Sequence, residues 1–147
     1  MDLRRLAGLG RLQPHETTPE EITKLRTLAQ RRLADARSTT ISDDLRFLAA
    51  YDAARSLAKM VLAAAGWRVT GYGQHYATFQ ALPEIMGEGY RDLSWYFDDC
   101  REKRNVAEYE EADTILPAEV EELIAAAEEF QPQVESWIAA IRPDLSP

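Results

Sequence analysis

Apolar side chains recur at three- and four-residue steps along most of the chain, the spacing that places them on one face of an α-helix. No segment has the strict alternation of a half-buried strand, and no internal repeat is evident. Caps, prolines and glycines divide the pattern into predicted helices over about 18–37, 42–65, 76–82, 90–110 and 117–142.

The predicted helices indicate an all-α fold, an antiparallel bundle of four to five helices joined by short connections. The helix over 42–65 is the most apolar, with Leu45 among its expected core residues, so it should be central. We expect one domain over 17–143, followed by a tail at 144–147. Residues 1–16 form a basic lead that is either a short amphipathic turn docking on a partner or a frayed terminus, and its glycines favour the second.

One arginine interrupts the apolar face of the helix over 90–110. That face comprises Leu93, Phe97, Cys100, Arg104 and Ala107. A guanidinium turned toward a core needs carboxylate, phosphate or backbone oxygen partners, because an unpaired buried charge is too costly to keep. Alternatively, Arg104 pairs with Glu108 one turn further on.

Asp52 is the second polar residue in an apolar setting, because it lies within the central helix. It is either an edge residue paired with Arg55 or Lys59, or it has an inward functional role.

Charge is divided unevenly over the chain. Residues 1–68 carry 12 Lys and Arg against 8 Asp and Glu, a net charge of +4, whereas residues 69–147 carry 5 against 17, a net charge of -12. RNA affinity depends largely on phosphate neutralisation, so any RNA contact should be local and should involve the first half together with Arg101, Lys103 and Arg104. Equally, both charge sets could be ordinary solvated helix faces.

Several classes of site are not expected. A single cysteine excludes an intramolecular disulfide, and only two histidines accompany it, so we expect no metal and no cofactor. The sequence has no phosphate-binding glycine loop and no Gly-x-Ser-x-Gly or His-Glu-x-x-His motif. It also lacks a membrane-spanning apolar run and a signal-peptide pattern, so a cytoplasmic location is expected.

Three segments in this order resemble the HEPN family, helical domains that include many toxin–antitoxin and phage-defence ribonucleases. They are 47–55 in the central helix, 73–79 at a helix start, and 101–109, which contains Arg104 and Asn105. The resemblance implies a homodimer whose protomers bring their motifs together in one cleft. It also implies an antitoxin or a nucleotidyltransferase-type protein as partner, with RNA as a further candidate.

The chain departs from the family pattern at the catalytic histidine. Family members cleave RNA without metal, using an arginine, often followed by asparagine, and a histidine a few positions later; Arg104 and Asn105 match the first part, but Tyr109 stands where the histidine would fall. Histidine, with a pKa of about 6.5, suits proton transfer near neutral pH, and tyrosine at about 10 does not. Losing such a base costs about 10² to 10⁴ in rate.

Three functions follow from these residues. The first is a degenerate ribonuclease scaffold that acts as a homodimeric partner- or RNA-binding module. The second is an active ribonuclease toxin that uses His75 or Tyr109 in place of the missing histidine. The third is a structural bundle in which Arg104 forms an ion pair with Asp52. We also expect dimerisation from the number of aromatic residues on one helix, namely Tyr90, Trp95, Tyr96 and Phe97.

Overall fold

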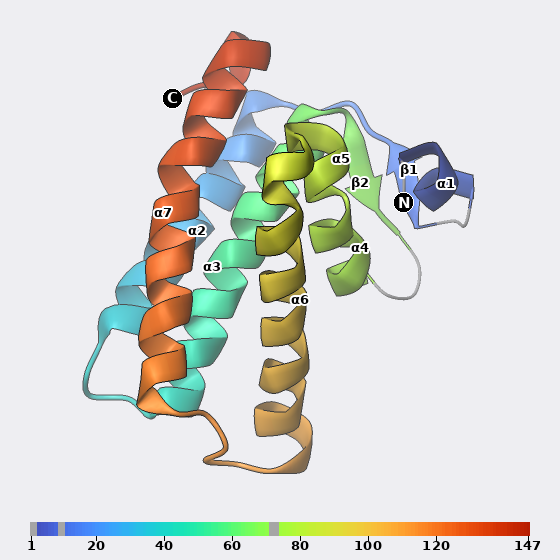
Figure 1. Cartoon of the computed structure of the whole chain (residues 1–147). Coiled ribbons are helices and arrows are strands. Elements are labelled where there is room, and N and C mark those ends of the chain that lie inside the picture. The colour runs from blue at the N-terminus through green and yellow to red at the C-terminus, as the bar shows by residue number, and fades with distance from the viewer. Residues whose placement is uncertain (1–2, 9–10, 71–73) are drawn as a thin grey trace.

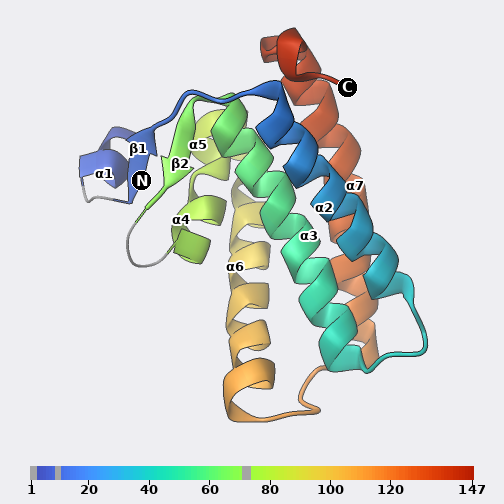
Figure 2. The same ribbon diagram turned by 180° about the vertical axis from the view of Figure 1, so that it is seen from behind.

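Four long helices form an antiparallel bundle in a computed structural model that describes residues 3–8, 11–70 and 74–147, without the side chains of residues 6 and 74–76. The long helices are α2 (Pro19–Arg37), α3 (Asp43–Ala64), α6 (Arg91–Asn105) and α7 (Pro117–Ile141). Each runs opposite to the one before it, and α3 lies between α2 and α6 (Figures 1 and 2). The predicted all-α bundle is confirmed.

The helix starts depend on local capping chemistry. The Thr18 hydroxyl accepts a hydrogen bond from the Glu21 amide at 3.3 Å, and the Ser42 hydroxyl accepts one from the Leu45 amide at 3.2 Å. At the start of α7, the Glu119 carboxylate accepts from the Leu116 amide at 3.0 Å. These bonds satisfy amides that have no partner within the helix, which explains why the predicted starts agree with the observed ones.

Helix α3 supplies the centre of the core. It packs against α2, α6 and α7, and most of its residues are buried. An aromatic cluster links it to the neighbouring helices: the Tyr51 and Phe79 ring centroids are 5.7 Å apart, those of Phe79 and Phe97 5.3 Å, and those of Phe97 and Phe130 5.6 Å. This apolar contact surface holds α3, α6 and α7 together.

The short helices α4 (Gln74–Gln80) and α5 (Leu82–Met86) lie between β2 and α6 at one end of the bundle, followed by a 3₁₀ turn, η1 (Glu88–Tyr90). Phe79 of α4 is fully buried, and its carbonyl accepts a hydrogen bond from Ser94 of α6 at 2.7 Å. The bond fixes α4 against the first turns of α6.

Two short strands differ from the prediction that the chain has none. Strand β1 (Leu12–Pro14) pairs antiparallel with β2 (Trp67–Val69), and Leu12 is only 2% exposed. Helix α1 (Leu3–Gly8) lies beside them, at the side of the bundle (Figure 1). Three residues are too few for an alternating pattern to be recognised, and the pairing joins segments far apart in sequence. The later part of the basic lead therefore belongs to the fold.

Helix α2 differs from the prediction in one buried residue. Arg26 is 9% exposed, although the apolar pattern did not place it inside. Its Nε donates to Glu135 Oε2 at 2.7 Å, and its Nη2 donates to Glu135 Oε1 at 3.0 Å and to the Leu145 carbonyl at 3.3 Å. Leu145, in the 3₁₀ turn η3 (Pro143–Leu145), is itself buried, so the predicted tail is packed against the bundle.

The apolar face of α3 also differs from the prediction at its first turn. Leu45, expected in the core, is 52% exposed, although the loop after α6 reaches this end of α3, where the Asp113 amide donates to Asp44 Oδ2 at 2.9 Å. Ile41 is exposed as well, and Leu48 is partly buried. Together Ile41, Leu45 and Leu48 form an apolar patch, which we call the Leu45 patch.

Candidate anion-binding site

Arg104 lies in the last turns of α6 and turns toward α3. Its side chain is 17% exposed, and its Nη2 pairs with Glu108 Oε2 at 3.1 Å, while Nη1 donates to Asn105 Oδ1 at 3.2 Å. Its Nε is buried and has no hydrogen-bond partner among the described residues. The predicted pairing with Glu108 is therefore confirmed, but it leaves one donor of the guanidinium unsatisfied.

Two tyrosine rings flank the Arg104 guanidinium. Its central carbon is 5.8 Å from the ring centroid of buried Tyr51 and 5.8 Å from that of Tyr109, which is 70% exposed. Both distances are within the range of cation–π attraction. One ring therefore anchors the arginine to the core, and the other partly shields it from solvent.

A wide helical turn brings Tyr109 back to Arg104. After Asn105 the chain continues as a π-helical turn, η2 (Val106–Glu110), closed by the Glu111 amide donating to the Val106 carbonyl at 2.8 Å. In an α-helix, a residue five positions on is rotated by about 140° from the first, whereas the wider turn reduces that offset. This is why Tyr109 contacts an arginine that α-helical spacing alone would place on another face.

Two more arginines lie around the Tyr51 ring. Burial raises the pKa of the Tyr51 hydroxyl, and the positive charges of Arg55, Arg104 and Arg101 oppose that rise. The Arg55 Nε is buried and has no hydrogen-bond partner among the described residues. Tyr51 and Arg55 are functional candidates that the sequence interpretation missed, because an apolar helix face gives no indication of which polar groups meet across it.

Arg101 belongs to this cluster but is already paired. Its Nε donates to Asp98 Oδ1 at 2.8 Å, and this bond raises the pKa of Arg101. The group formed by Tyr51, Arg55, Arg101 and Arg104, with Tyr109 over it, is referred to below as the Arg104 cluster.

Asp52 is close to this cluster without forming the ion pair with Arg104 that the structural hypothesis requires. Within the described chain, the Asp52 carboxylate has no hydrogen bond and no ion pair, whereas Arg104 pairs with Glu108. Burial raises the pKa of Asp52, and the charges of Arg104, Arg55 and Arg32 oppose the rise. The predicted Arg104–Asp52 pair is therefore wrong; the two charges interact only at longer range.

Lys103 does not join the Arg104 cluster, contrary to the sequence expectation of one basic patch. Its Nζ lies 2.5 Å from Glu119 Oε2, across the opposite side of α6 toward the start of α7. This bond raises the pKa of Lys103. Successive positions on a helix are rotated by about 100°, so adjacent basic residues face different neighbours.

The His75 side chain, a proposed substitute for the missing base, lies outside the described residues. Of the other groups near α6, Cys100 is buried, and burial raises the pKa of its thiol to about 12. A thiol with that pKa is protonated at neutral pH. Beside the Arg104 cluster, Asp52 is a carboxylate whose pKa is raised by burial.

Two shallow hollows adjoin the Arg104 cluster. One, of about 140 Å³, is lined by Arg104, Ala107 and Glu108 on one side and by Leu45 and Leu48 on the other. A larger one, of about 440 Å³, lies between α2 and α3 and includes Asp52 and the Leu45 patch. The Leu45 patch is thus continuous with the charged cluster.

The aromatic residues of η1 and α6 do not support the dimer prediction in the way expected. Phe97 is fully buried, and Tyr90 and Tyr96 are partly buried against the core, leaving Trp95 as the one strongly exposed member of the four at 61%. One bundle therefore absorbs most of this aromatic surface.

Comparison with family models, curated proteins and solved structures found no match to this chain. In the described part of the chain, no helix is both long enough and apolar enough to cross a membrane. Over the same residues, no three His, Cys, Asp or Glu side chains gather in a way that could hold a metal ion.

Proposed function

We propose that the protein is a HEPN-like binding module of a toxin–antitoxin or defence system that recognises RNA through the Arg104 cluster and does not cleave it efficiently. The observation that carries this proposal is the placement of Arg104 between Tyr51 and Tyr109 with a buried donor left unsatisfied. Guanidinium groups bind phosphate bidentately, and exposed aromatic rings stack on unpaired bases. Arg104 and Tyr109 supply one of each, side by side.

RNA binding at Arg104 requires that a phosphate displace Glu108. Its carboxylate occupies Arg104 at 3.1 Å, so a phosphate must displace it. The Arg104 side chain is 17% exposed and that of Glu108 is 36% exposed, so the pair is partly buried, and a phosphate that replaces Glu108 must offer Arg104 an equivalent charged hydrogen bond. With an overall charge of -8, affinity should be modest and strongly dependent on salt.

Catalysis is not expected, because the described residues of the cluster include no side chain that ordinarily titrates near pH 7. Cleavage by the ribose 2′-hydroxyl requires proton transfer to such a group. An active ribonuclease is the alternative; it would need His75, Tyr109 or the perturbed Asp52 carboxyl as its base.

A protein partner is the second candidate ligand of this site. Arg104 already pairs with the Glu108 carboxylate, and an acidic side chain of an antitoxin or a nucleotidyltransferase-type partner could replace that carboxylate in the same way. Binding of RNA and binding of an acidic protein partner both weaken with salt, so competition between the partner and RNA for the protein distinguishes these two ligands better than salt dependence does.

We also propose that two copies associate through the Leu45 patch. Ile41 and Leu45 are exposed, and Leu45 and Leu48 adjoin Arg104, so pairing of two patches would bring two Arg104 clusters toward one cleft. Light scattering at micromolar concentration tests this, with Leu45→Arg expected to give a monomer and Trp95→Arg serving as the exposed control. A wild-type monomer under these conditions would exclude the dimer.

The test of the function is binding of a labelled single-stranded RNA, measured by fluorescence anisotropy at two salt concentrations. Arg104→Ala should weaken binding about tenfold or more, because a charged hydrogen bond to phosphate is lost. The matched control is Arg91→Ala on the same helix, whose guanidinium also pairs with a glutamate, Glu88, at 2.6 Å. Glu108→Gln should tighten binding, since it frees Arg104.

Equal RNA affinity of wild type and Arg104→Ala would refute RNA recognition by this cluster and would favour the protein partner. The same RNA incubated in EDTA tests catalysis. Cleavage by wild type that is lost in Arg104→Ala would replace the binding module with the active ribonuclease, and Asp52→Asn, Tyr109→Phe and His75→Ala would then identify the base.

A further inference from the structure

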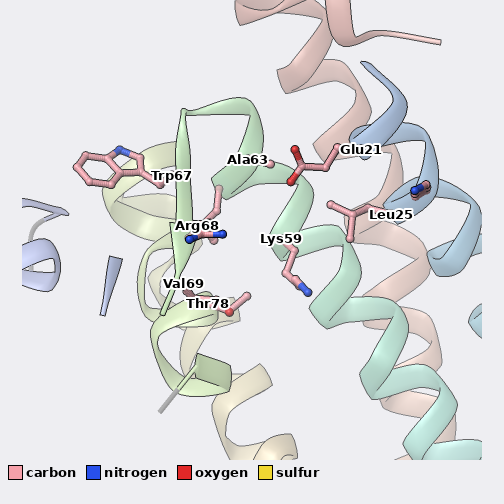
Figure 3. Close-up of a pocket in the computed structure, with 10 residues that line it drawn as sticks. Glu21, Leu25, Lys59, Ala63, Trp67, Arg68, Val69 and Thr78 are labelled. Carbon is pink, nitrogen blue, oxygen red and sulfur yellow. The ribbon is translucent and has the colours of Figure 1, made fainter. Parts of the chain in front are cut away.

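A second site lies at the other end of α3, away from the Arg104 cluster. It is a cleft of about 360 Å³ between α2, α3, β2 and α4, shown in Figure 3. A volume of this size falls within the range of small-molecule sites. Nothing in the proposed RNA-binding function uses it.

The walls of the cleft combine apolar surface with positive charge. Leu25, Leu62 and Val69 contribute apolar side chains, while Lys24, Lys59 and Arg68 contribute three positive charges. Glu21 is the one carboxylate among the described lining residues, and the charged groups therefore sum to +2. Such a lining suits a ligand that has both an apolar body and a negative group.

The carboxylate of the cleft is already engaged. His15 Nε2 lies 2.9 Å and 2.7 Å from the two Glu21 oxygens. Glu21 thus makes its direct contact with His15, and its charge acts on Lys59 only at longer range. Its bond to His15 also ties the segment after β1 to the first turn of α2.

Lys59 is the half-buried lysine of the cleft, whereas Lys24 is exposed. The Lys59 ammonium group has no hydrogen bond or ion pair among the described residues, although the side chain is half-buried. Burial and the neighbouring charge of Arg55 lower the pKa of Lys59, and Glu21 opposes them. An ammonium group kept in this position, rather than an apolar side chain, gains from a bound anion that replaces its lost hydration.

We propose that the cleft binds a small organic anion, with its carboxylate or phosphate group held by Lys59 and its apolar body against Leu25, Leu62 and Val69. Arg68 adds positive charge to the cleft, while its guanidinium contacts the side-chain amide of Gln13, its partner in β1. Residues of four elements contribute to the cleft, including the β1–β2 sheet through Arg68. The two short strands thus complete a ligand site that the helical bundle alone would leave open.

The test is a titration of ¹⁵N-labelled protein followed by amide chemical shifts. The probes are benzoate and phenyl phosphate, with inorganic phosphate as the anion without an apolar body and benzyl alcohol as the apolar body without charge. Benzoate, phenyl phosphate or both should shift the amides of Lys59, Leu62 and Val69, and should bind more tightly than either control. The relative affinities of the two organic probes distinguish a carboxylate site from a phosphate site.

Lys59→Met should weaken that binding about tenfold or more while leaving the fold unchanged, because Lys59 has no ion pair to lose. The matched control is Lys103→Met, the same substitution at a lysine paired with Glu119 at the far end of α6. Equal affinity of wild type and Lys59→Met, or shifts absent from the cleft, would overturn the proposal. Inorganic phosphate binding as tightly as phenyl phosphate would overturn the organic class of ligand.

Discussion

The Arg26–Glu135 pair should be the most sensitive polar contact of the bundle. It joins α2 to α7 through two hydrogen bonds of 2.7 Å and 3.0 Å, with the side chains 11% and 25% exposed. Removing one partner of a buried pair costs about 3–5 kcal/mol, because it leaves the other charge desolvated. Since Glu135 keeps some exposure, we expect Glu135→Ala to lower the free energy of unfolding by about 3 kcal/mol.

Chemical denaturation measures this change, and thermal unfolding should show a loss of about 6–12 °C for a chain of this length. The matched control is Glu128→Ala, which removes the ion pair with Arg37 between the same two helices but at the surface, and should cost less than about 1 kcal/mol. The double substitution Arg26→Met with Glu135→Leu should recover most of the loss, since no charge is stranded. Equal effects of Glu135→Ala and Glu128→Ala would refute the reasoning.

Three further predictions concern single groups. Asp52→Asn should raise the free energy of unfolding at pH 7 and have little effect near pH 3. The pKa of Asp52 is raised in the folded state, so the wild type loses stability as the pH rises from 3.8 through that folded-state pKa. Denaturation at both pH values checks the sign of the effect. Cys100 should resist iodoacetamide in the native protein at pH 7.5 and react after unfolding, because burial raises the pKa of its thiol to about 12. Mass spectrometry measures the adduct, and rapid labelling of the native protein would contradict a buried, protonated thiol. Ser94→Ala should cost about 1–3 kcal/mol by leaving the Phe79 carbonyl without its 2.7 Å hydrogen bond, and an unchanged denaturation midpoint would show that water replaces the hydroxyl.

Local chemistry explains why much of the fold was predictable. The α2 start at Thr18 and Pro19 and the α3 start at Ser42 depend on residues within one turn of each other. The face of α6 that includes Phe97, Cys100 and Arg104 follows from helical spacing alone. These features were recognised because their partners are adjacent in sequence.

Contacts between distant segments were not predictable in the same way. Arg26 was missed because its partner, Glu135, is 109 positions away, and the β1–β2 pairing joins segments near opposite ends of the first half of the chain. The exposure of Leu45 also depends on how other segments pack against the first turn of α3. Periodicity shows which residues share a face, but not what covers that face.

The candidate site likewise has features that depend on one helix and features that depend on contacts between helices. The sequence by itself determined that Arg104 would lie on an inward face and that Glu108 was its available partner, because both depend on the rise and turn of one helix. Only the tertiary structure placed Tyr51 and Arg55 beside Arg104, directed Lys103 toward Glu119 and left Asp52 without an ion pair among the described residues. Those outcomes depend on how α3, α6 and α7 pack, and packing is decided by the whole core rather than by any one segment.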